Sequence, residues 1–268
     1  MNKSALALAA LALFATLAHA EDYLSPTEER VRFSLGAVRL SNNTNFQIDS
    51  SAGLPGTPVN GEDQFGLDKS DFEAKIEVQV RAGERHRLRF DYFSLDRSGQ
   101  TLVTEPIVFR DVVLQPGDPL QSDLSIRTFE IAYEYSFLHS DRYEVAATLG
   151  VADTDISARA RVQTATRHVD QTEDQAGPVP LIGLDATYVI SKRFYVDGRA
   201  QYLKVRADDL DGTLGIYEFD ALYRLRPNIS FALGYSVFRA NLLSSQTKQA
   251  GYFNFDSQGP EAFLRVAF

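Results

Sequence analysis

Residues 126–137 read IRTFEIAYEYSF, and large apolar side chains in this stretch alternate with polar or small ones. Successive side chains of a β-strand point to opposite faces. The stretch therefore predicts a strand with one apolar face and one polar face that carries charge. The apolar face holds Phe129, Ile131, Tyr133, Tyr135 and Phe137, and the other face holds Thr128, Glu130, Ala132, Glu134 and Ser136.

The same alternation recurs along the whole chain. Each alternating segment is long enough to cross a membrane as a tilted strand, which needs ~9–11 residues. No segment beyond the N-terminal region is apolar for the ~18 residues that indicate a membrane helix. The ten segments are 30–40, 72–81, 86–95, 126–137, 142–152, 180–190, 193–206, 213–225, 229–238 and 260–268.

The connections between these segments alternate in length, apart from the brief 207–212. Tight periplasmic turns and longer external loops are typical of outer-membrane barrels. We therefore predict an all-β fold, an antiparallel up-and-down transmembrane β-barrel of about ten strands, with about 8 or 12 as alternatives. Four short periplasmic turns are expected at 82–85, 138–141, 191–192 and 226–228, and long extracellular loops at 41–71, 96–125, 153–179 and 239–259.

A soluble β-sandwich or lipocalin-like barrel also alternates, but it turns its apolar faces inward. Here the polar faces carry many charges of both signs, which suit a barrel interior better than an open sheet. Aromatic residues also gather beside the short turns, as in the interfacial girdles of membrane barrels. They are Tyr135, Phe137, Tyr143, Tyr188, Phe194 and Tyr223.

The strand number depends on residues 107–109 and 112–114, two short β-prone runs inside the 96–125 connection. They read either as a further pair of wall strands or as an extracellular hairpin. Pro106 interrupts the first run, and proline is poorly tolerated inside a sheet. We therefore expect a hairpin outside the membrane.

The first 20 residues are typical of a secretory signal peptide. Lys3 supplies the positive start, an apolar run follows, and Ala18-His19-Ala20 forms a small-residue cleavage site. Cleavage would leave residues 21–268 as a single outer-membrane β-barrel domain. The chain has no Cys, which excludes disulfides, thiolate metal sites and a cysteine nucleophile. Its net charge of −9 argues against nucleic acid as a partner.

The chain ends on an alternating strand whose last residue is aromatic. Leu264, Val266 and Phe268 form its outward row, which resembles the C-terminal signature read by the outer-membrane barrel-assembly machinery. Together with the architecture, this makes the chain similar to the small OmpA-like and OmpW-like barrels of Gram-negative bacteria. The resemblance implies integral residence in the outer membrane. It also implies outer-membrane lipid, lipopolysaccharide and the assembly machinery as partners. It does not fix an activity.

If the apolar faces meet lipid, a dense set of charges points inward. A small barrel has little room beyond its own side chains, and unpaired buried charge costs several kcal/mol. We therefore expect these charges to pair, to fix strand register and to fill the lumen. The network is expected to centre on Glu73, Lys75, Glu77, Arg81, Arg87, Arg89, Asp91, Glu130 and Glu134, beside Arg32, Glu144, Asp185, Asp197, Arg199, Glu218, Asp220, Arg224, Glu261 and Arg265.

Three functions stay open at this point. The first is a non-enzymatic surface, structural or adhesion-type barrel whose loops face an extracellular ligand. The second is a narrow channel for ions or small solutes. The third is an outer-membrane hydrolase like the omptin proteases, which pair carboxylates with a His at the outer rim. His168 with Asp170 is the one such pair on the outer side, and the omptin pattern around it is absent. We therefore predict no catalytic residue, no cofactor and no metal site.

Overall fold

A computed structural model describes residues 24–164, 168–207, 210–245 and 250–268. The signal peptide predicted at 1–20 lies outside these described residues. No helix in the described residues is long and apolar enough to span a membrane.

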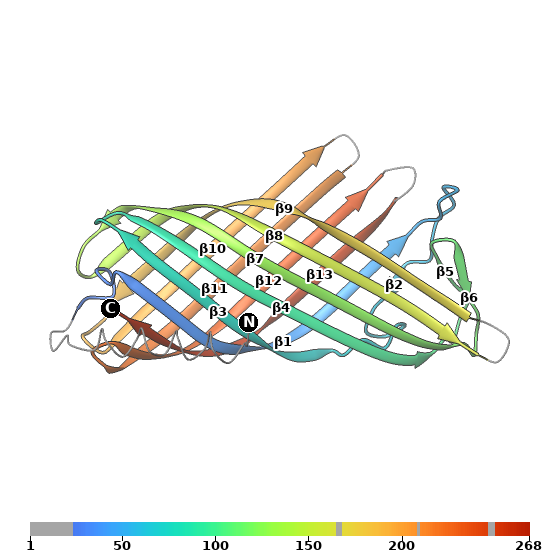
Figure 1. Ribbon diagram of the computed structural model, residues 1–268, viewed down its shortest axis with the longest axis horizontal. Coiled ribbons are helices and arrows are strands. Elements are labelled where there is room, and N and C mark those ends of the chain that lie inside the picture. Colours follow the sequence, from blue (N-terminus) through green and yellow to red (C-terminus); the bar gives the residue numbers. More distant parts are fainter. Residues whose placement is uncertain (1–23, 165–167, 208–209, 246–249) are drawn as a thin grey trace, which may run out of the picture.

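The fold is a closed antiparallel barrel (Figure 1). Consecutive wall strands pair with one another, and β13 pairs with β1 from Arg32–Ala267 to Ile48–Gly251, which closes the cylinder. The predicted up-and-down barrel of ten strands is confirmed. The wall strands are β1 (Val31–Ile48), β3 (Ser70–Ala82), β4 (His86–Leu102), β7 (Pro119–His139), β8 (Tyr143–Gln163), β9 (His168–Val189), β10 (Phe194–Ala207), β11 (Leu210–Arg226), β12 (Ile229–Ser244) and β13 (Gly251–Ala267).

Three short strands lie outside the wall. β5 (Ile107–Phe109) and β6 (Val112–Leu114) form a separate two-stranded sheet, and β2 (Val59–Asn60) pairs with β1. The expectation that 107–114 forms an extracellular hairpin is therefore correct. Figure 1 places β2, β5 and β6 together at the end of the barrel opposite the C-terminus.

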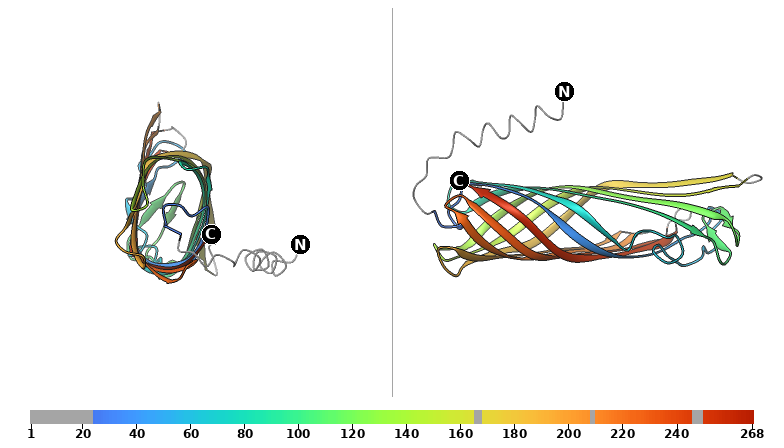
Figure 2. Two further views of the ribbon diagram at one scale, coloured as in Figure 1. Left: turned by 90° about the vertical axis from the view of Figure 1, so that its left-hand side faces the viewer. Right: turned by 90° about the horizontal axis from the view of Figure 1, so that it is seen from below.

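The predicted long loops are shorter than expected because the strands continue beyond the membrane. β8 and β9 pair without a break from Tyr143–Tyr188 to Gln163–His168, through most of the segment expected to be the 153–179 loop. β12 and β13 likewise pair up to Ser244–Gly251. Beyond the membrane the outer sheet face meets water, so the hydrogen-bond ladder persists although the outward side chains no longer need to be apolar. The extended β8–β9 hairpin projects furthest (Figure 2).

The outer face of the barrel carries an apolar belt. Leu149, Ile182 and Phe219 are each about 60% exposed, as only side chains facing away from the lumen can be. Hydrocarbon surface on this scale is stable when lipid covers it. The aromatic residues predicted to border the short turns are exposed as well, among them Tyr143 and Tyr188.

The segment that precedes β1 turns into the barrel mouth near the C-terminus. Ser25 and Thr27 are buried there, and Arg30 donates its backbone N–H to the carbonyl of Phe268 at 2.6 Å. The end-on view in Figure 2 shows the beginning of the described chain inside the barrel outline. The periplasmic mouth is therefore covered by the chain's own N-terminal segment.

Candidate functional site

The lumen near the periplasmic end is built around Arg89 of β4, which is fully buried. Its guanidinium contacts Asp91 of its own strand and carboxylates from two other strands, Glu130 and Glu134 of β7 and Asp185 of β9. The four N–O distances lie between 2.6 and 3.0 Å. A guanidinium offers five donors in a fixed fork, so one side chain ties three strands together.

The other luminal charges extend this arrangement across the barrel. We call this set, with Arg89 and its partners, the charged layer. Its further ion pairs join Arg199 to Glu77, Asp185 and Glu218, Lys75 to Glu218 and Glu261, Arg87 to Glu134 and Glu144, Arg81 to Glu144, and Arg265 to Asp197 and Glu77.

Register alone would place like charges together. Arg81 of β3 lies directly opposite Arg87 of β4, and like charges in that relation repel. Glu144 of β8 resolves the conflict, because its carboxylate lies 2.7 Å from Arg81 and 2.8 Å from Arg87. Ser136 donates a further hydrogen bond to Glu144 at 2.5 Å. The sequence predicts Glu144 as an inward residue but cannot assign it this bridging position, which depends on barrel closure.

Of the nine residues expected at the centre of the network, the structure brings eight together and leaves Glu73 aside. Glu73 lies opposite Val38 of β1, above Lys75. It is partly exposed, and among the described residues it forms no ion pair. The charged groups that act on it, those of Asp71 and Asp96, are acidic as well, so the charged layer ends at Lys75 on this strand.

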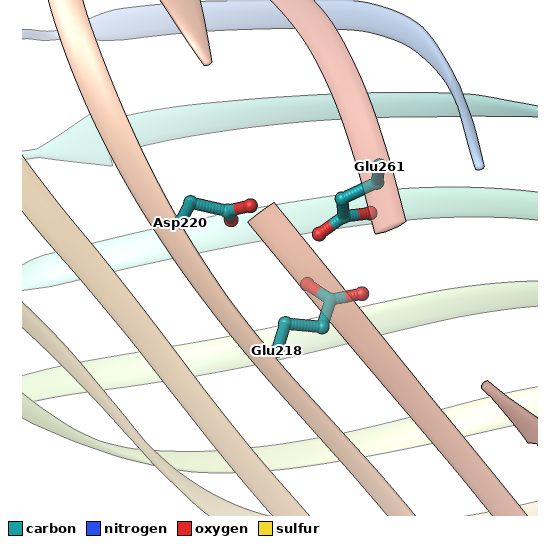
Figure 3. Close-up of side chains that lie close together, drawn as sticks. All are labelled: Glu218, Asp220 and Glu261. Atoms are coloured by element: carbon teal, nitrogen blue, oxygen red, sulfur yellow. The ribbon is translucent and has the colours of Figure 1, made fainter. Parts of the chain in front are cut away.

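Three carboxylates gather on one side of the charged layer, from Glu218, Asp220 and Glu261 (Figure 3). One oxygen of each lies within 4.8 Å of the others, a spacing that suits a metal ion. The ammonium of Lys75 already lies 2.9 Å from both Glu218 and Glu261. Lys75 therefore supplies a positive charge to two of the three carboxylates.

Close packing around Asp220 depends on a glycine. A Cβ at Gly234 of β12, directly opposite, would lie 1.9 Å from the Asp220 carboxylate. Any other residue there would displace the carboxylate from its neighbours.

The N-terminal segment 24–30 closes the charged layer from the periplasmic side. Glu29 pairs with Arg32 at 2.9 Å and with Arg224 at 3.1 Å. Burial raises the pKa of Glu29, while the two guanidinium groups act in the opposite direction. Arg224 also donates to the carbonyl of Leu24 at 2.7 Å, and Ser25 donates to that of Asp141. This periplasmic cap is absent from the sequence-based expectations, because its residues show no periodicity.

Little open space remains within the charged layer. The cavity found there measures about 30 Å³ and is lined by residues such as Lys75, Glu77, Arg199 and Arg265. One buried water needs roughly 10–15 Å³, so the space holds about two waters. The charged side chains thus occupy the lumen almost completely.

The lumen of the extracellular half is apolar, which corrects the expectation that all inward faces are polar. We call this region the apolar layer. Loop residues such as Phe65 and Phe109 fill part of it, with ring centroids 5.7 Å apart. Its buried members are Val38, Leu40, Val59, Phe65, Leu67, Leu95, Val103, Ile107, Phe109, Leu114, Leu120, Leu124, Ile126, Ala160, Val162 and Phe255.

An ion pair fixes the loop that lies over the apolar layer. Arg97 of β4 and Glu62 of the 61–69 segment approach to 2.7 Å, and both are buried. Glu62 also accepts hydrogen bonds from the backbone N–H and the hydroxyl of Thr44 in β1. The segment is therefore held between two wall strands.

A second cavity, of about 90 Å³, lies within the apolar layer. Ala158 and Ala160 of β8 line one side of it, and Phe253 of β13 and Phe46 of β1 line the other. Alternation on the extended parts of β1, β7 and β13 is the signal that would have located this layer. Most of the layer lies outside the segments that the membrane-length criterion selects, although Val38, Leu40, Leu95 and Ile126 fall at their ends.

The predicted assembly residues occupy the outer face of the last strand. Leu264 is 49% exposed, and Val266 and Phe268 are partly exposed on the same side. The Phe268 backbone N–H donates to the carbonyl of Val31, which holds the terminus against β1.

The pair His168 and Asp170 does not form a catalytic arrangement in this structure. Arg159 of β8 holds the Asp170 carboxylate through two hydrogen bonds, one of them 2.7 Å long. This contact lowers the pKa of Asp170. The Asp170 carboxylate thus binds a guanidinium and not an imidazole.

The fold is shared with a known outer-membrane protein. The chain is similar to the outer membrane protease OmpT from Escherichia coli, with 12% identity, a TM-score of 0.57, and coverage of 92% of this chain and 99% of OmpT. At this identity the likeness shows the fold alone. The fold and the lipid-facing belt together place the protein in the outer membrane.

Two further likenesses have TM-scores below 0.5, and we infer nothing from them. The transport unit of the autotransporter AIDA-I from Escherichia coli has a TM-score of 0.47 at 8% identity, covering 96% of this chain and 97% of that one. The toluene transporter TodX of Pseudomonas putida has a TM-score of 0.37 at 9% identity, covering 95% and 92%. No family model matches the sequence, and no curated protein matches it.

Proposed function

We propose that the protein is a closed, non-enzymatic barrel that presents its extracellular strands and loops at the cell surface. The charged layer is the observation that carries this proposal. Arg89 contacts four carboxylates, and the cavity found within the layer measures only about 30 Å³. A conducting barrel needs a continuous water path, whereas paired charges at this density obstruct one and fix the register of the strands.

The layers on either side support the same function. The cap at 24–30 covers the periplasmic mouth, and the apolar layer lies above the charges. An ion entering from outside would leave water for an apolar region, which is costly. A narrow channel is therefore the weaker alternative.

A protease role has little support from the geometry. The likeness to OmpT concerns the fold, and a fold does not carry an activity with it. Asp170, the carboxylate next to His168, is bound to Arg159. The surface role, with the loops contacting an extracellular ligand, remains the better proposal.

Planar-bilayer recording of the refolded protein tests the proposal. We expect insertion without steady conductance, with heat-modifiable migration on gels as evidence that the inserted protein is folded. Steady open-channel current from the wild type would reject the closed barrel and favour the channel.

A further inference from the structure

Asp220 differs from the other acids of the charged layer because no cationic side chain pairs with it. Each of the other carboxylates has a guanidinium or ammonium partner. Asp220 is only 5% exposed, yet it forms no ion pair with any residue that the structure describes. Its Oδ1 atom is buried and has no hydrogen-bond donor. A buried carboxylate without partners is strongly unfavourable, so this position calls for a further positive group.

The free oxygen of Asp220 shares its surroundings with a second one. Asp220 of β11 lies opposite Gly234 of β12, and Gly234 in turn lies opposite Glu261 of β13. The two carboxylates therefore flank a residue without a side chain, over which they point toward each other (Figure 3). Glu261 is 3% exposed, and its Oε1 atom is also buried without a hydrogen-bond donor. Two unsatisfied oxygens thus meet from strands that are not neighbours.

A third carboxylate joins them from the same strand as Asp220. Glu218 precedes Asp220 by two residues, so both side chains point into the lumen. One oxygen of each of the three acids lies within 4.8 Å of the others. Lys75 contacts the other two carboxylates but not that of Asp220. Arg199 also contacts Glu218, but it is shared with further carboxylates. Three carboxylates and one ammonium leave two negative charges, which a divalent cation would balance.

We propose that Glu218, Asp220 and Glu261 bind one hard divalent cation, for which Ca²⁺ is the best match. Carboxylate oxygens are the ligands that such ions prefer. Ca²⁺ lies about 2.3–2.6 Å from its ligands and Mg²⁺ only about 2.0–2.1 Å. Oxygens up to 4.8 Å apart therefore suit the larger ion.

Water next to the three acids can complete the coordination. The cavity of about 30 Å³ in the charged layer is lined by Glu218 and Asp220 among other residues. It has room for about two waters, at roughly 10–15 Å³ each. Calcium takes six to eight oxygen ligands and accepts waters among them, so the carboxylates need not supply the whole set.

The position of the site indicates a structural role for the cation. It would join β11 to β13 across Gly234 of β12, beside Lys75 of β3, and so hold the part of the barrel next to its closure. The apolar layer lies above it and the cap at 24–30 below. The sequence predicts no metal site because these acids meet only after three strands have paired. The inference goes beyond the proposed function and does not depend on it.

Calcium content and thermal stability test the proposal. The protein is refolded in an uncharged maltoside detergent, once with millimolar CaCl₂ and once with EDTA, and is then separated from free ions by gel filtration. We expect elemental analysis to find one calcium per barrel in the first sample. A ligand that binds only the folded state stabilises it in proportion to the logarithm of its concentration. The unfolding midpoint, followed by circular dichroism, should therefore rise with the CaCl₂ concentration.

Variants at the site separate cation binding from a general effect on folding. Asp220→Asn keeps the size of the side chain and removes its charge, so it should lose both the calcium and the calcium-dependent shift. In EDTA it should unfold at or above the wild-type midpoint, because an unpaired buried charge has been removed. Glu261→Gln should lose the calcium as well. Asp155→Asn, which removes an exposed acid of β8, should keep the calcium and the shift.

Three results would overturn the proposal. Wild-type protein refolded in CaCl₂ but free of calcium would mean that a proton, and not a metal ion, neutralises Asp220. Equal calcium content in the wild type and Asp220→Asn would place the ion elsewhere on the protein. Asp220→Asn unfolding well below the wild type in EDTA would show that the carboxylate stabilises the barrel without a cation. None of these readouts involves conductance, so failure here is distinguishable from failure of the closed-barrel proposal.

Discussion

At the scale of single residues, Arg89 is the side chain on which the charged layer depends most. It is fully buried, and removing it leaves four carboxylates without their shared cation. Breaking a buried ion pair by deleting one partner costs about 3–5 kcal/mol. We expect Arg89→Ala to lower the free energy of unfolding by about that amount, measured by urea denaturation of the refolded barrel.

Lys69→Ala is the matched control for Arg89→Ala. Lys69 also pairs with a carboxylate, that of Asp63 at 2.9 Å, but both side chains are about 70% exposed. Exposed pairs add little to stability because water and salt screen them, so the control should unfold near the wild-type midpoint. Equal midpoints for Arg89→Ala and wild type would show that the charged layer does not stabilise the barrel.

Phe268 is the second residue with a distinct expected effect. Its backbone bonds to Val31 and Arg30 hold the end of β13 at the barrel closure, and its side chain continues the row of Leu264 and Val266. We expect deletion of Phe268 to reduce the amount of heat-modifiable protein in the outer-membrane fraction. Phe268→Tyr, which keeps an aromatic terminus, is the control. Wild-type amounts of the deletion variant would contradict a role in assembly.

For single residues, the sequence predicts which way a side chain points better than it predicts which side chains it contacts. Alternation alone places Arg81, Arg87 and Glu144 inside the barrel. It cannot show that Glu144 bridges the two arginines, because that contact joins β8 to strands more than fifty residues earlier. Which charged side chains meet in the lumen depends on how the barrel closes and on the stagger of its strands, and no local sequence pattern encodes either.

At the scale of elements, the short turns and the long connections should lie on opposite sides of the membrane. The chain has no Cys, so single substitutions report sidedness cleanly. We expect Glu105→Cys, exposed beside the β5–β6 hairpin, to react with a membrane-impermeant maleimide on intact cells. Ser191→Cys, in the β9–β10 turn, should react only after the outer membrane is permeabilised. The reverse labelling pattern would invert the topology.

The sequence predicts where the strands lie better than it predicts how long they are. The membrane-crossing parts follow from lipid on one face and charge on the other. β8 extends to Gln163 and β9 starts at His168, and in the extended part of β8 the apolar side chains, Ala158, Ala160 and Val162, are the inward ones. The polarity of the two faces is thus reversed relative to the membrane-crossing part, so a search for a lipid-facing apolar row misses the extensions.

At the scale of the whole molecule, the lumen is divided into three levels. The cap at 24–30 lies at the periplasmic mouth, the charged layer above it, and the apolar layer with its loops above that. Composition and alternation predict the middle level. The cap is an irregular segment that folds back into the barrel, and the apolar layer combines inward side chains of the extended wall strands with such segments, for example the loop fixed by Glu62 and Arg97. These segments take their positions from the closed barrel that surrounds them.

Because three levels lie one above another in the lumen, we predict that removing one of them does not open the barrel. Deleting residues 21–30 from the mature chain removes Glu29 and with it the carboxylate partner of Arg32 and Arg224. The Arg89 cluster and the 30 Å³ cavity beside it remain, because no residue of the cap contributes to them. We expect this variant to unfold more easily and still to show no steady current in planar bilayers.

Combining the deletion with Arg89→Ala removes two levels and should raise ion leakage above that of either change alone. Steady conductance from the cap deletion alone would mean that the cap, and not the charged layer, closes the protein.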